Sequence, residues 1–390
     1  MSINSFVCPI CGNNDIHSIG YLNGKPYCRR CISFRGEEVE RKPSYPKKAP
    51  IHLEYELSPE QKELSDKLVE NYKKGINSLV FAVCGSGKTE IVLAVIQKAL
   101  EDGKKVGFAI PRRDVVIEIA TRLKYIFLEN KITSVFGGNI NHLDGDIVCL
   151  TTHQLYRYND YFDLLIIDEL DAFPFKGDFV LNQMFLRAKK GVFIKMSATV
   201  SNEELKEAKE SDVDIITLGV RYHHKRIPVP KVIKPISKYF YLYKKLKKYE
   251  REHKQVFVFV PTIDLSRQLY SIFKHYIKQV NYVNSKREQR NKIISDFKEG
   301  KTQTLFTTSV LERGVTVKGL QVIVFKADDH VFDSATLIQI SGRVGRKKNQ
   351  TKGDVIFISN HETDSIRECI KTIQSSNTLL QSMFQEDKGE

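Results

Sequence analysis

The chain has 390 residues, enough for two or three domains, and 41% of them are hydrophobic, which is ample for packed cores. Its 61 lysines and arginines outnumber 47 acidic residues, and the resulting charge of +14 favours a polyanionic partner, nucleic acid or an acidic membrane surface, over a merely solvated basic surface. The sequence has neither an apolar run of about 18 residues nor a secretory signal pattern, so we expect a cytoplasmic protein without a membrane span.

The first predicted module, residues 1–35, contains two cysteine pairs, Cys8 with Cys11 and Cys28 with Cys31. This spacing is typical of a zinc site with four thiolates, because each pair forms a tight turn that offers two sulfurs to one tetrahedral ion. We predict a structural zinc site, since four sulfurs leave no open position for catalysis. A redox role for the pairs is the rival, and contact with nucleic acid remains open beside plain stabilisation.

Residues 36–56 combine charge clusters with prolines and predict a linker. The next predicted domain, residues 57–218, opens with a helix whose N-cap is Ser58 and whose first residue is Pro59. Gln61, in the first turn, is a candidate for reading an adenine edge, with a solvated glutamine as the alternative.

A glycine-rich loop follows an apolar strand predicted at 78–81 and precedes a helix predicted at 90–100. Strand, glycine loop and helix are the context of a P-loop, in which backbone N–H groups and the helix N-terminus surround phosphate oxygens. The predicted nucleotide-binding residues are Gly85, Ser86, Gly87, Lys88 and Thr89. We expect Lys88 at the β- and γ-phosphates of ATP and the Thr89 hydroxyl on Mg²⁺. A chance glycine turn before a helix is the alternative.

An apolar strand predicted at 164–167 ends in an acidic pair, Asp168 and Glu169. In a P-loop protein such a pair completes the site: Asp168 is expected to hold Mg²⁺, and Glu169 to orient and deprotonate the attacking water. Another predicted strand ends at Ser197 and Thr199, which are expected to couple the nucleotide site to the neighbouring domain or to cap a helix.

Several predicted strands end in basic or hydroxyl side chains, at the edge where open parallel sheets bind ligands. These side chains suit the phosphate backbone of a nucleic acid. The predicted nucleic-acid contacts are Arg112, Arg113, Thr152, Thr262 and Thr307.

Residues 219–235 are basic and proline-bearing and predict a hinge, and residues 236–390 predict a second parallel-sheet domain without a P-loop. Its sharpest feature is a motif in which Arg343 and Arg346, three apart, would share one helix face with Gln339. If that face closes on the P-loop, the arginines neutralise charge on the transferring phosphoryl group, and Gln339 contacts the water or a phosphate. A solvated basic helix end is the alternative.

Together these motifs resemble superfamily 2 helicases, over about residues 55–360. The motifs that carry the resemblance are 85–89, 168–171, 197–199, 307–314 and 339–346. Within the superfamily the chain is similar to the ComFA-type late competence ATPases, on three features. These are the N-terminal cysteine module, the linker phrase at 221–223 with 228–230, and the pairing of 311–316 with 339–346. PriA-type replication restart helicases are similar in motor sequence, but they place cysteines within the second motor domain.

The resemblance implies an α/β fold with two tandem RecA-like P-loop domains after the zinc module. It implies a cytoplasmic motor, peripheral at the inner face of the membrane, that uses ATP, Mg²⁺ and Zn²⁺ and drives single-stranded DNA during natural transformation. The implied partners are the DNA-uptake channel and a small phosphoribosyltransferase-like competence protein. A ring, which is a homo-oligomer, and a monomer both stay open.

Three rival functions remain: an RNA helicase, a replication-restart-type DNA helicase, and a nucleotide-gated DNA-binding scaffold. The RNA reading is weakened because 168–171 is not Asp-Glu-Ala-Asp and because Thr316 stands where RNA-remodelling enzymes often place an aspartate. A pure scaffold has no use for Glu169, Arg343 and Arg346, which favours an enzyme.

Overall fold

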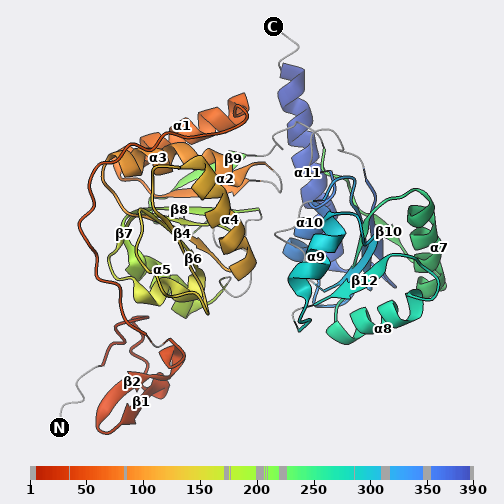
Figure 1. Cartoon of the computed structure of the whole chain (residues 1–390), viewed down its shortest axis with the longest axis horizontal. Helices are drawn as coiled ribbons and strands as arrows, with labels where there is room; N and C mark the ends of the chain where they lie inside the picture. The colour runs from red at the N-terminus through yellow and green to blue at the C-terminus, as the bar shows by residue number, and fades with distance from the viewer. Residues whose placement is uncertain are drawn as a thin grey trace. The chain divides into compact units, whose positions relative to one another are not determined.

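The computed structural model describes residues 6–34, 36–82, 86–170, 175, 177–198, 206, 208, 210–218, 226–284, 286–308, 317–345 and 353–386, with backbone alone at 291 and 379–386. The chain divides into two compact units. The first consists of Met1–Ala82 and Gly87–Leu218, and the second of Val83–Ser86 and Gly219–Glu390. Figure 1 shows the elements of each unit, coloured along the chain.

The N-terminal module is a small hairpin with short helical turns. Its elements are η1 (Ile16–Ser18), β1 (Ile19–Leu22), β2 (Lys25–Cys28) and η2 (Arg29–Cys31). The two-residue turn between the antiparallel strands is Asn23 and Gly24, with φ of 49° and 74°. Positive φ at both positions is the geometry for which Asn-Gly is favoured, so this turn is set by local sequence.

The first unit is built on a seven-stranded parallel sheet in the order β5-β6-β4-β7-β8-β3-β9. The strands are β3 (Ser78–Ala82), β4 (Val106–Ile110), β5 (Ile132–Val135), β6 (Ile147–Thr151), β7 (Phe162–Ile167), β8 (Lys189–Ser197) and β9 (Asp214–Leu218). The central strands β4 and β7 are buried along their whole length, as near-continuous apolar runs in a parallel sheet predict.

The helices of the first unit are α1 (Pro59–Lys74), α2 (Lys88–Ile91), α3 (Leu93–Glu101), α4 (Arg113–Ile126), η3 (Thr152–Arg157) and α5 (Phe179–Ala188). Of these, α1 and α5 begin after the side-chain caps Ser58 and Asp178, and α2 begins after Gly87. The single helix predicted at 90–100 is in fact two, because α2 ends just before Val92 and α3 begins just after it, with Val92 between them at φ and ψ of −92° and −3°. The predicted cap of α1 is confirmed: the Ser58 hydroxyl accepts from the Gln61 N–H, at 3.3 Å.

Residues 36–56 contain no helix or strand among the described positions, as their prolines predict. They nevertheless lie against the first unit as a strap. Arg41 Nη2 lies 2.6 Å from Asp163 Oδ2, and Lys47 Nζ lies 2.8 Å from Asp146 Oδ1. Both carboxylates are at the amino ends of their strands, so the strap crosses the edge of the sheet opposite the predicted ligand edge.

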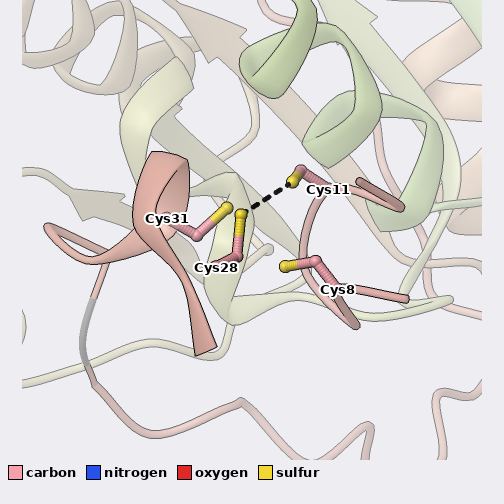
Figure 2. A group of neighbouring side chains, drawn as sticks. All are labelled: Cys8, Cys11, Cys28 and Cys31. Atoms are coloured by element: carbon pink, nitrogen blue, oxygen red, sulfur yellow. Dashed lines mark hydrogen bonds between the residues drawn. The ribbon is translucent and has the colours of Figure 1, made fainter. Parts of the chain in front are cut away.

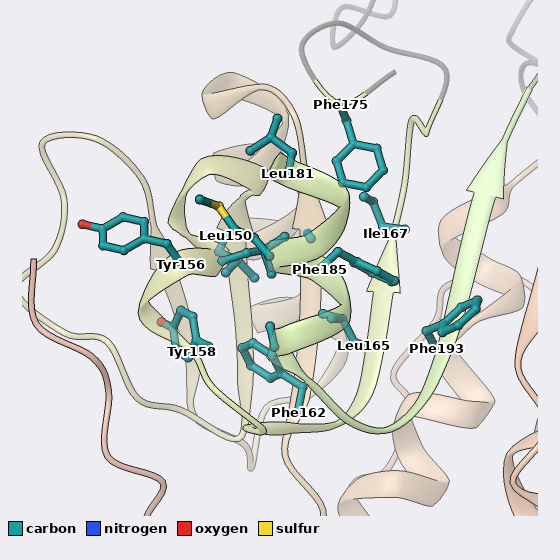
Figure 3. Close-up of a cluster of buried hydrophobic side chains, with 14 of the residues drawn as sticks. Leu150, Tyr156, Tyr158, Phe162, Leu165, Ile167, Phe175, Leu181, Phe185 and Phe193 are labelled. Carbon is teal, nitrogen blue, oxygen red and sulfur yellow. The ribbon is translucent and has the colours of Figure 1, made fainter. Parts of the chain in front are cut away.

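A large apolar cluster fills the space between the sheet and α5 with η3 (Figure 3). Phe162, Leu165 and Ile167 come from β7, and Phe185 comes from α5. The four module cysteines belong to the same continuous cluster. A module of this size has too little core of its own, and it shares that of the larger domain.

The second unit is a six-stranded parallel sheet in the order β10-β15-β14-β11-β13-β12. Its strands are β10 (Lys231–Ile233), β11 (Val256–Phe259), β12 (Val280–Val283), β13 (Thr304–Thr307), β14 (Gln321–Phe325) and β15 (Val355–Ile358). Its helices are α7 (Lys238–Arg251), α8 (Ile263–Phe273), α9 (Arg290–Lys298), α10 (Ser334–Ser341) and α11 (Asp364–Glu386). Strand β10 lies within the segment predicted as a hinge, and it pairs with β15.

The α/β fold with two parallel sheets after a cysteine module is therefore confirmed. Within the described part of the chain, none of the helices combines the length and the apolar character that crossing a bilayer requires.

Candidate active site and metal centre

The four module cysteines converge on one point (Figure 2). Their sulfurs all lie within 4.8 Å of one another, and Cys11 Sγ is 3.9 Å from Cys28 Sγ. A tetrahedral zinc ion with Zn–S distances of about 2.3 Å separates its sulfurs by about 3.8 Å. All four thiols are buried and free of disulfides. The donor set and the spacing therefore fit the predicted zinc ion.

Local backbone geometry prepares this centre. The Gly12 N–H donates to the Cys8 carbonyl at 2.8 Å, and Gly12 adopts a φ of 65°, which makes the first cysteine pair a tight turn. Burial raises the pKa of Cys11 to about 11 and also raises that of Cys31. At Cys28 burial acts in the same direction, but backbone N–H groups lower the pKa overall. A cation that binds thiolates offsets the cost of burying these sulfurs.

The P-loop lysine lies at the acidic pair of the first unit. Lys88 opens α2, Asp168 follows β7, and Lys88 Nζ lies 3.6 Å from Asp168 Oδ1. Thr89 is buried beside Lys88 in α2. The structure thus brings together two predicted halves of the ATP site, 80 positions apart in sequence. Gly85 lies outside the described residues, and Ser86 is described and buried.

Gly87 forms a cradle that only glycine fits. Its φ is 84°, and a Cβ on it would lie 2.3 Å from Gln61 Nε2 and 3.2 Å from Glu90 Oε2. Gln61 is 4% exposed, so the solvated alternative for this side chain is wrong. Its Oε1 accepts from the Ser58 N–H at 3.0 Å, which holds the amide beside the P-loop. The backbone at Gly87, which has no side chain, and the fixed Gln61 amide beside it fit a nucleotide phosphate group.

Glu169 has an uncommon backbone conformation for a residue with a side chain, with φ of 63°. Its neighbours hold it there. The Asp168 N–H donates to the Ala109 carbonyl at 3.1 Å, and the Leu170 N–H donates to the Met196 carbonyl at 3.2 Å. Because strands on both sides fix its neighbours, the candidate base is positioned by the sheet rather than by its own preference.

The arginine motif of the second unit differs from its prediction. Helix α10 ends at Ser341, and Arg343 lies in the turn that follows, where its N–H donates to the Ile340 carbonyl at 3.1 Å. The expectation that Arg343 and Gln339 lie on one α-helix is therefore wrong: after Ser341 the chain continues in tighter turns, in which the N–H groups of residues 343 and 344 donate to the carbonyls three residues earlier, up to Gly345, whose φ is 72°. Gln339 and Arg343 are both buried, at 5% and 1% exposure.

Some of the predicted residues lie outside the part of the chain that the structure describes, namely Gly85, Asp171, Thr199, Arg346, Thr316 and the ranges 221–223 and 309–314.

The predicted nucleic-acid residues of the first unit lie at the carboxyl ends of neighbouring strands. Strands β4 and β6 are paired, and Arg112 and Thr152 follow them. Arg113 is exposed, with its guanidinium carbon 4.7 Å from the centre of the Phe136 ring. Thr152 is fully buried, so its side chain is not available at the surface described here. The sheet edge thus carries nucleotide residues after β3 and β7 and basic residues after β4.

The corresponding residues of the second unit follow the paired strands β11 and β13. Thr262 is exposed, and its hydroxyl accepts from the Leu265 N–H at 3.1 Å as the cap of α8. Thr307 is buried, and its hydroxyl donates to the Thr308 carbonyl at 3.0 Å. The Thr262 O–H stays able to donate to a phosphate oxygen, whereas burial keeps the Thr307 side chain from the surface.

Two loops at the same edges were not singled out from the sequence. The loop after β5 carries Phe136, and the loop after β12 carries Lys286 and Arg287, with the Arg287 guanidinium carbon 4.0 Å from the centre of the Tyr282 ring. The sequence itself offers a signal for the loop after β12, since two basic residues stand side by side there. The loop after β5 has no such sequence signal, because β5 mixes polar and apolar residues.

Comparisons with known proteins agree with this geometry. The family model described as Helicase conserved C-terminal domain matches residues 237–348, and that described as Type III restriction enzyme, res subunit, matches residues 54–202. Among solved structures, Saccharomyces cerevisiae Dbp5 bound to RNA and ADP BeF3 shares the fold, with a TM-score of 0.61 and 16% identity over 82% of this chain and 92% of that chain.

Two curated relatives extend the likeness over almost the whole chain. The Competence protein ComFA of Bacillus subtilis is 32% identical over 413 positions, which cover 97% of this chain and 88% of that protein. The Competence protein ComFA of Streptococcus pneumoniae is also 32% identical, over 95% of this chain and 90% of that protein. The chain therefore belongs to the ComFA family and is a nucleic-acid-dependent ATPase of helicase superfamily 2, an ATP-dependent helicase-like motor.

Proposed function

We propose that this motor translocates single-stranded DNA and drives its uptake during natural transformation. The observation that carries the proposal is the 32% identity over 97% of the chain with a protein named as a competence protein. The basic charge of +14 supports a polyanionic substrate, and the basic side chains beside β4 lie at the ligand edge of a parallel sheet.

In the proposed ATP site, the P-loop backbone and Lys88 bind the phosphates, and Thr89 with Asp168 holds Mg²⁺. The bound ion supplies charge neutralisation at the phosphates. Glu169 orients the attacking water and accepts its proton, from a backbone position that the sheet fixes. Gln61 faces the adenine ring of ATP. Residues 339–346 complete the site when ATP is bound. Support comes from the Lys88–Asp168 distance of 3.6 Å and from the glycine cradle.

The proposed DNA path runs over the loops after β4 and β6 in the first unit and after β11 and β13 in the second. Its contacts with the sugar-phosphate backbone are independent of sequence, so affinity falls steeply with salt. ATP binds one conformation of the motor more tightly than ADP does. Alternation between conformations during hydrolysis therefore moves the DNA strand in steps. We further propose peripheral attachment at the inner face of the membrane. The proposed partners are the uptake channel and a phosphoribosyltransferase-like competence protein, with self-association into a ring as one mode of action.

The test is ATP hydrolysis by the purified full chain with single-stranded DNA, duplex DNA, RNA or no nucleic acid. We expect stimulation by single-stranded DNA, lost in both Lys88→Ala and Glu169→Gln. Lys62→Ala, an exposed lysine on α1, is the matched control and should hydrolyse as the wild type does. Equal stimulation by RNA would favour an RNA helicase, and strand displacement on forked duplexes a replication-restart-type helicase. Tight DNA binding with negligible turnover would favour a nucleotide-gated scaffold.

A further inference from the structure

The cysteine module has no role in the proposed mechanism of ATP hydrolysis. Its last described residue, Phe34, is tied to the metal centre, because the Phe34 N–H donates to the Cys31 carbonyl at 2.9 Å. The Phe34 ring stacks on the His153 ring, with centroids 6.1 Å apart and an interplanar angle of 30°. It also contacts the Tyr156 ring, with centroids 5.8 Å apart. Both partners belong to η3, so the module is docked on that short helix.

The residues after the module continue along η3. A Cβ on Gly36 would lie 2.5 Å from Arg157 Nη1 and 2.6 Å from the Tyr156 hydroxyl, so the backbone passes as close as glycine allows. Arg157 Nη1 donates to the Glu37 carbonyl at 3.2 Å, and the Val39 N–H donates to the Arg157 carbonyl at 2.7 Å. The contact with η3 is therefore continuous in sequence and combines aromatic packing with hydrogen bonds.

Helix η3 begins at the same edge of the sheet as the loop that carries the predicted DNA-contacting arginines. The helix begins at Thr152, directly after β6, and β6 pairs with β4, whose loop carries Arg112 and Arg113. A 3₁₀ helix of six residues is marginal by itself and depends on tertiary support. On its inner side Leu155 is fully buried in the domain core, and Tyr156 lies at the edge of that core (Figure 3). On its outer side the aromatic support comes from Phe34.

We propose that the cysteine module is a brace for the nucleic-acid edge of the first unit. The metal-bound module holds Phe34 against His153 and Tyr156, and this contact fixes the position of η3, which begins at Thr152. Phe34 is thus a positioning residue for single-stranded DNA, and the module acts through η3 rather than through direct contact with DNA. The inference rests on the proposed function, because it presumes that this edge binds DNA.

The experiment uses the full chain and three measurements: zinc content, affinity for a fluorescein-labelled oligo(dT) by anisotropy, and the kcat and KM(DNA) of ATP hydrolysis. Phe34→Ala should keep its zinc and its melting temperature. It should weaken oligo(dT) binding and raise KM(DNA) by about 3- to 10-fold, the range expected for an aromatic contact, with kcat nearly unchanged. Phe34→Tyr should restore both values. Tyr21→Ala removes an exposed ring of the same module and should have no effect.

A second arm covers failure of Phe34→Ala to fold. Zinc chelation of the wild type should weaken oligo(dT) binding by a similar factor, with no further effect on Phe34→Ala if that variant is folded. Unchanged affinity in zinc-loaded Phe34→Ala, or unchanged affinity after chelation, overturns the brace. A loss of affinity in Lys25→Glu/Arg29→Glu as large as in Phe34→Ala also overturns it, since it indicates direct DNA contact. Absence of DNA binding and DNA-stimulated hydrolysis in the wild type refutes the proposed function instead.

Discussion

Arg122 on α4 and Glu90 on α2 form an ion pair, with 2.5 Å between Nη2 and Oε1. The Tyr55 hydroxyl joins both, at 2.8 Å from each side chain. Helix α2 begins at Lys88, and α4 begins at Arg113. The pair therefore joins the helix that starts at the phosphate loop to the helix that starts at the predicted DNA loop. These are the two places where ATP and DNA are expected to act on the first unit.

We expect Arg122→Gln to uncouple hydrolysis from DNA. Basal ATP hydrolysis should stay within about twofold of the wild type, and the stimulation by single-stranded DNA should fall by about 3- to 10-fold, the scale of one coupling interaction of 1 kcal/mol or so. The measurement is kcat with and without oligo(dT). Lys124→Gln, on an exposed position of the same helix, is the control. Full stimulation in Arg122→Gln, or an equal loss in Lys124→Gln, would contradict this role.

The strands that the sequence predicts best are buried ones. The ranges predicted at 78–81 and 164–167 agree with β3 and β7 to within one and two residues, because both are apolar runs. The unpredicted strands β5, β9 and β10 lie at sheet edges, where one side faces no neighbour. Their burial is partial and their residues mix polar with apolar, so no apolar run distinguishes them.

The site residues likewise divide into those with a local sequence signal and those without one. Lys88 and Asp168 were found from sequence because each sits in a local motif with its own strand. The Arg122–Glu90 pair has no such signal, since it joins an ordinary arginine to an ordinary glutamate 32 positions away. The packing of Phe34 on η3 is likewise a tertiary contact that no spacing rule predicts.

The strap makes a specific prediction for stability. Arg41 is the partner of Asp163, which is 9% exposed and also accepts from the Lys105 N–H at 2.9 Å. Arg41→Ala leaves a nearly buried carboxylate without its cation, and we expect a loss of about 2 kcal/mol in the free energy of unfolding. Urea denaturation measures it, with Lys42→Ala as the exposed neighbour for comparison. Equal urea midpoints for the two variants would show that the contact between Arg41 and Asp163 does not stabilise the fold.

Acid sensitivity should depend on Asp144. Burial by itself raises the pKa of this carboxyl, but hydrogen bonds from Lys105 and from the Tyr161 hydroxyl outweigh burial and lower the pKa below its ordinary value. The carboxylate therefore stabilises the fold above about pH 4, and this contribution is lost as pH falls through the lowered pKa. Melting temperatures between pH 7 and pH 3 should show a shallower acid decline in Asp144→Asn than in the wild type. Asp160→Asn, at an exposed position, should decline as the wild type does.

The metal centre predicts one zinc ion per chain. Cys11→Ser/Cys31→Ser should abolish zinc binding, because two ligands remain and the affinity of a four-thiolate site needs all of its sulfurs. Cys149→Ala removes an equally buried thiol of β6 outside the cluster and should keep the ion. Elemental analysis of the purified chains measures this directly. Zinc retained at wild-type stoichiometry in the double variant would exclude the cluster as the binding site.

The glycine cradle predicts a sharp effect of one methyl group. Gly87→Ala places a side chain on a backbone with φ of 84° and crowds Gln61 Nε2, so we expect ATP affinity to fall about tenfold or more. Gly87→Ala/Gln61→Ala removes the crowding but not the backbone strain, and it should recover only part of the loss. Gly137→Ala is the control, because a Cβ there meets open space. Binding of a fluorescent ATP analogue separates the outcomes: affinity restored fully by the second substitution would mean that Gln61, and not the left-handed backbone, makes glycine necessary at this position.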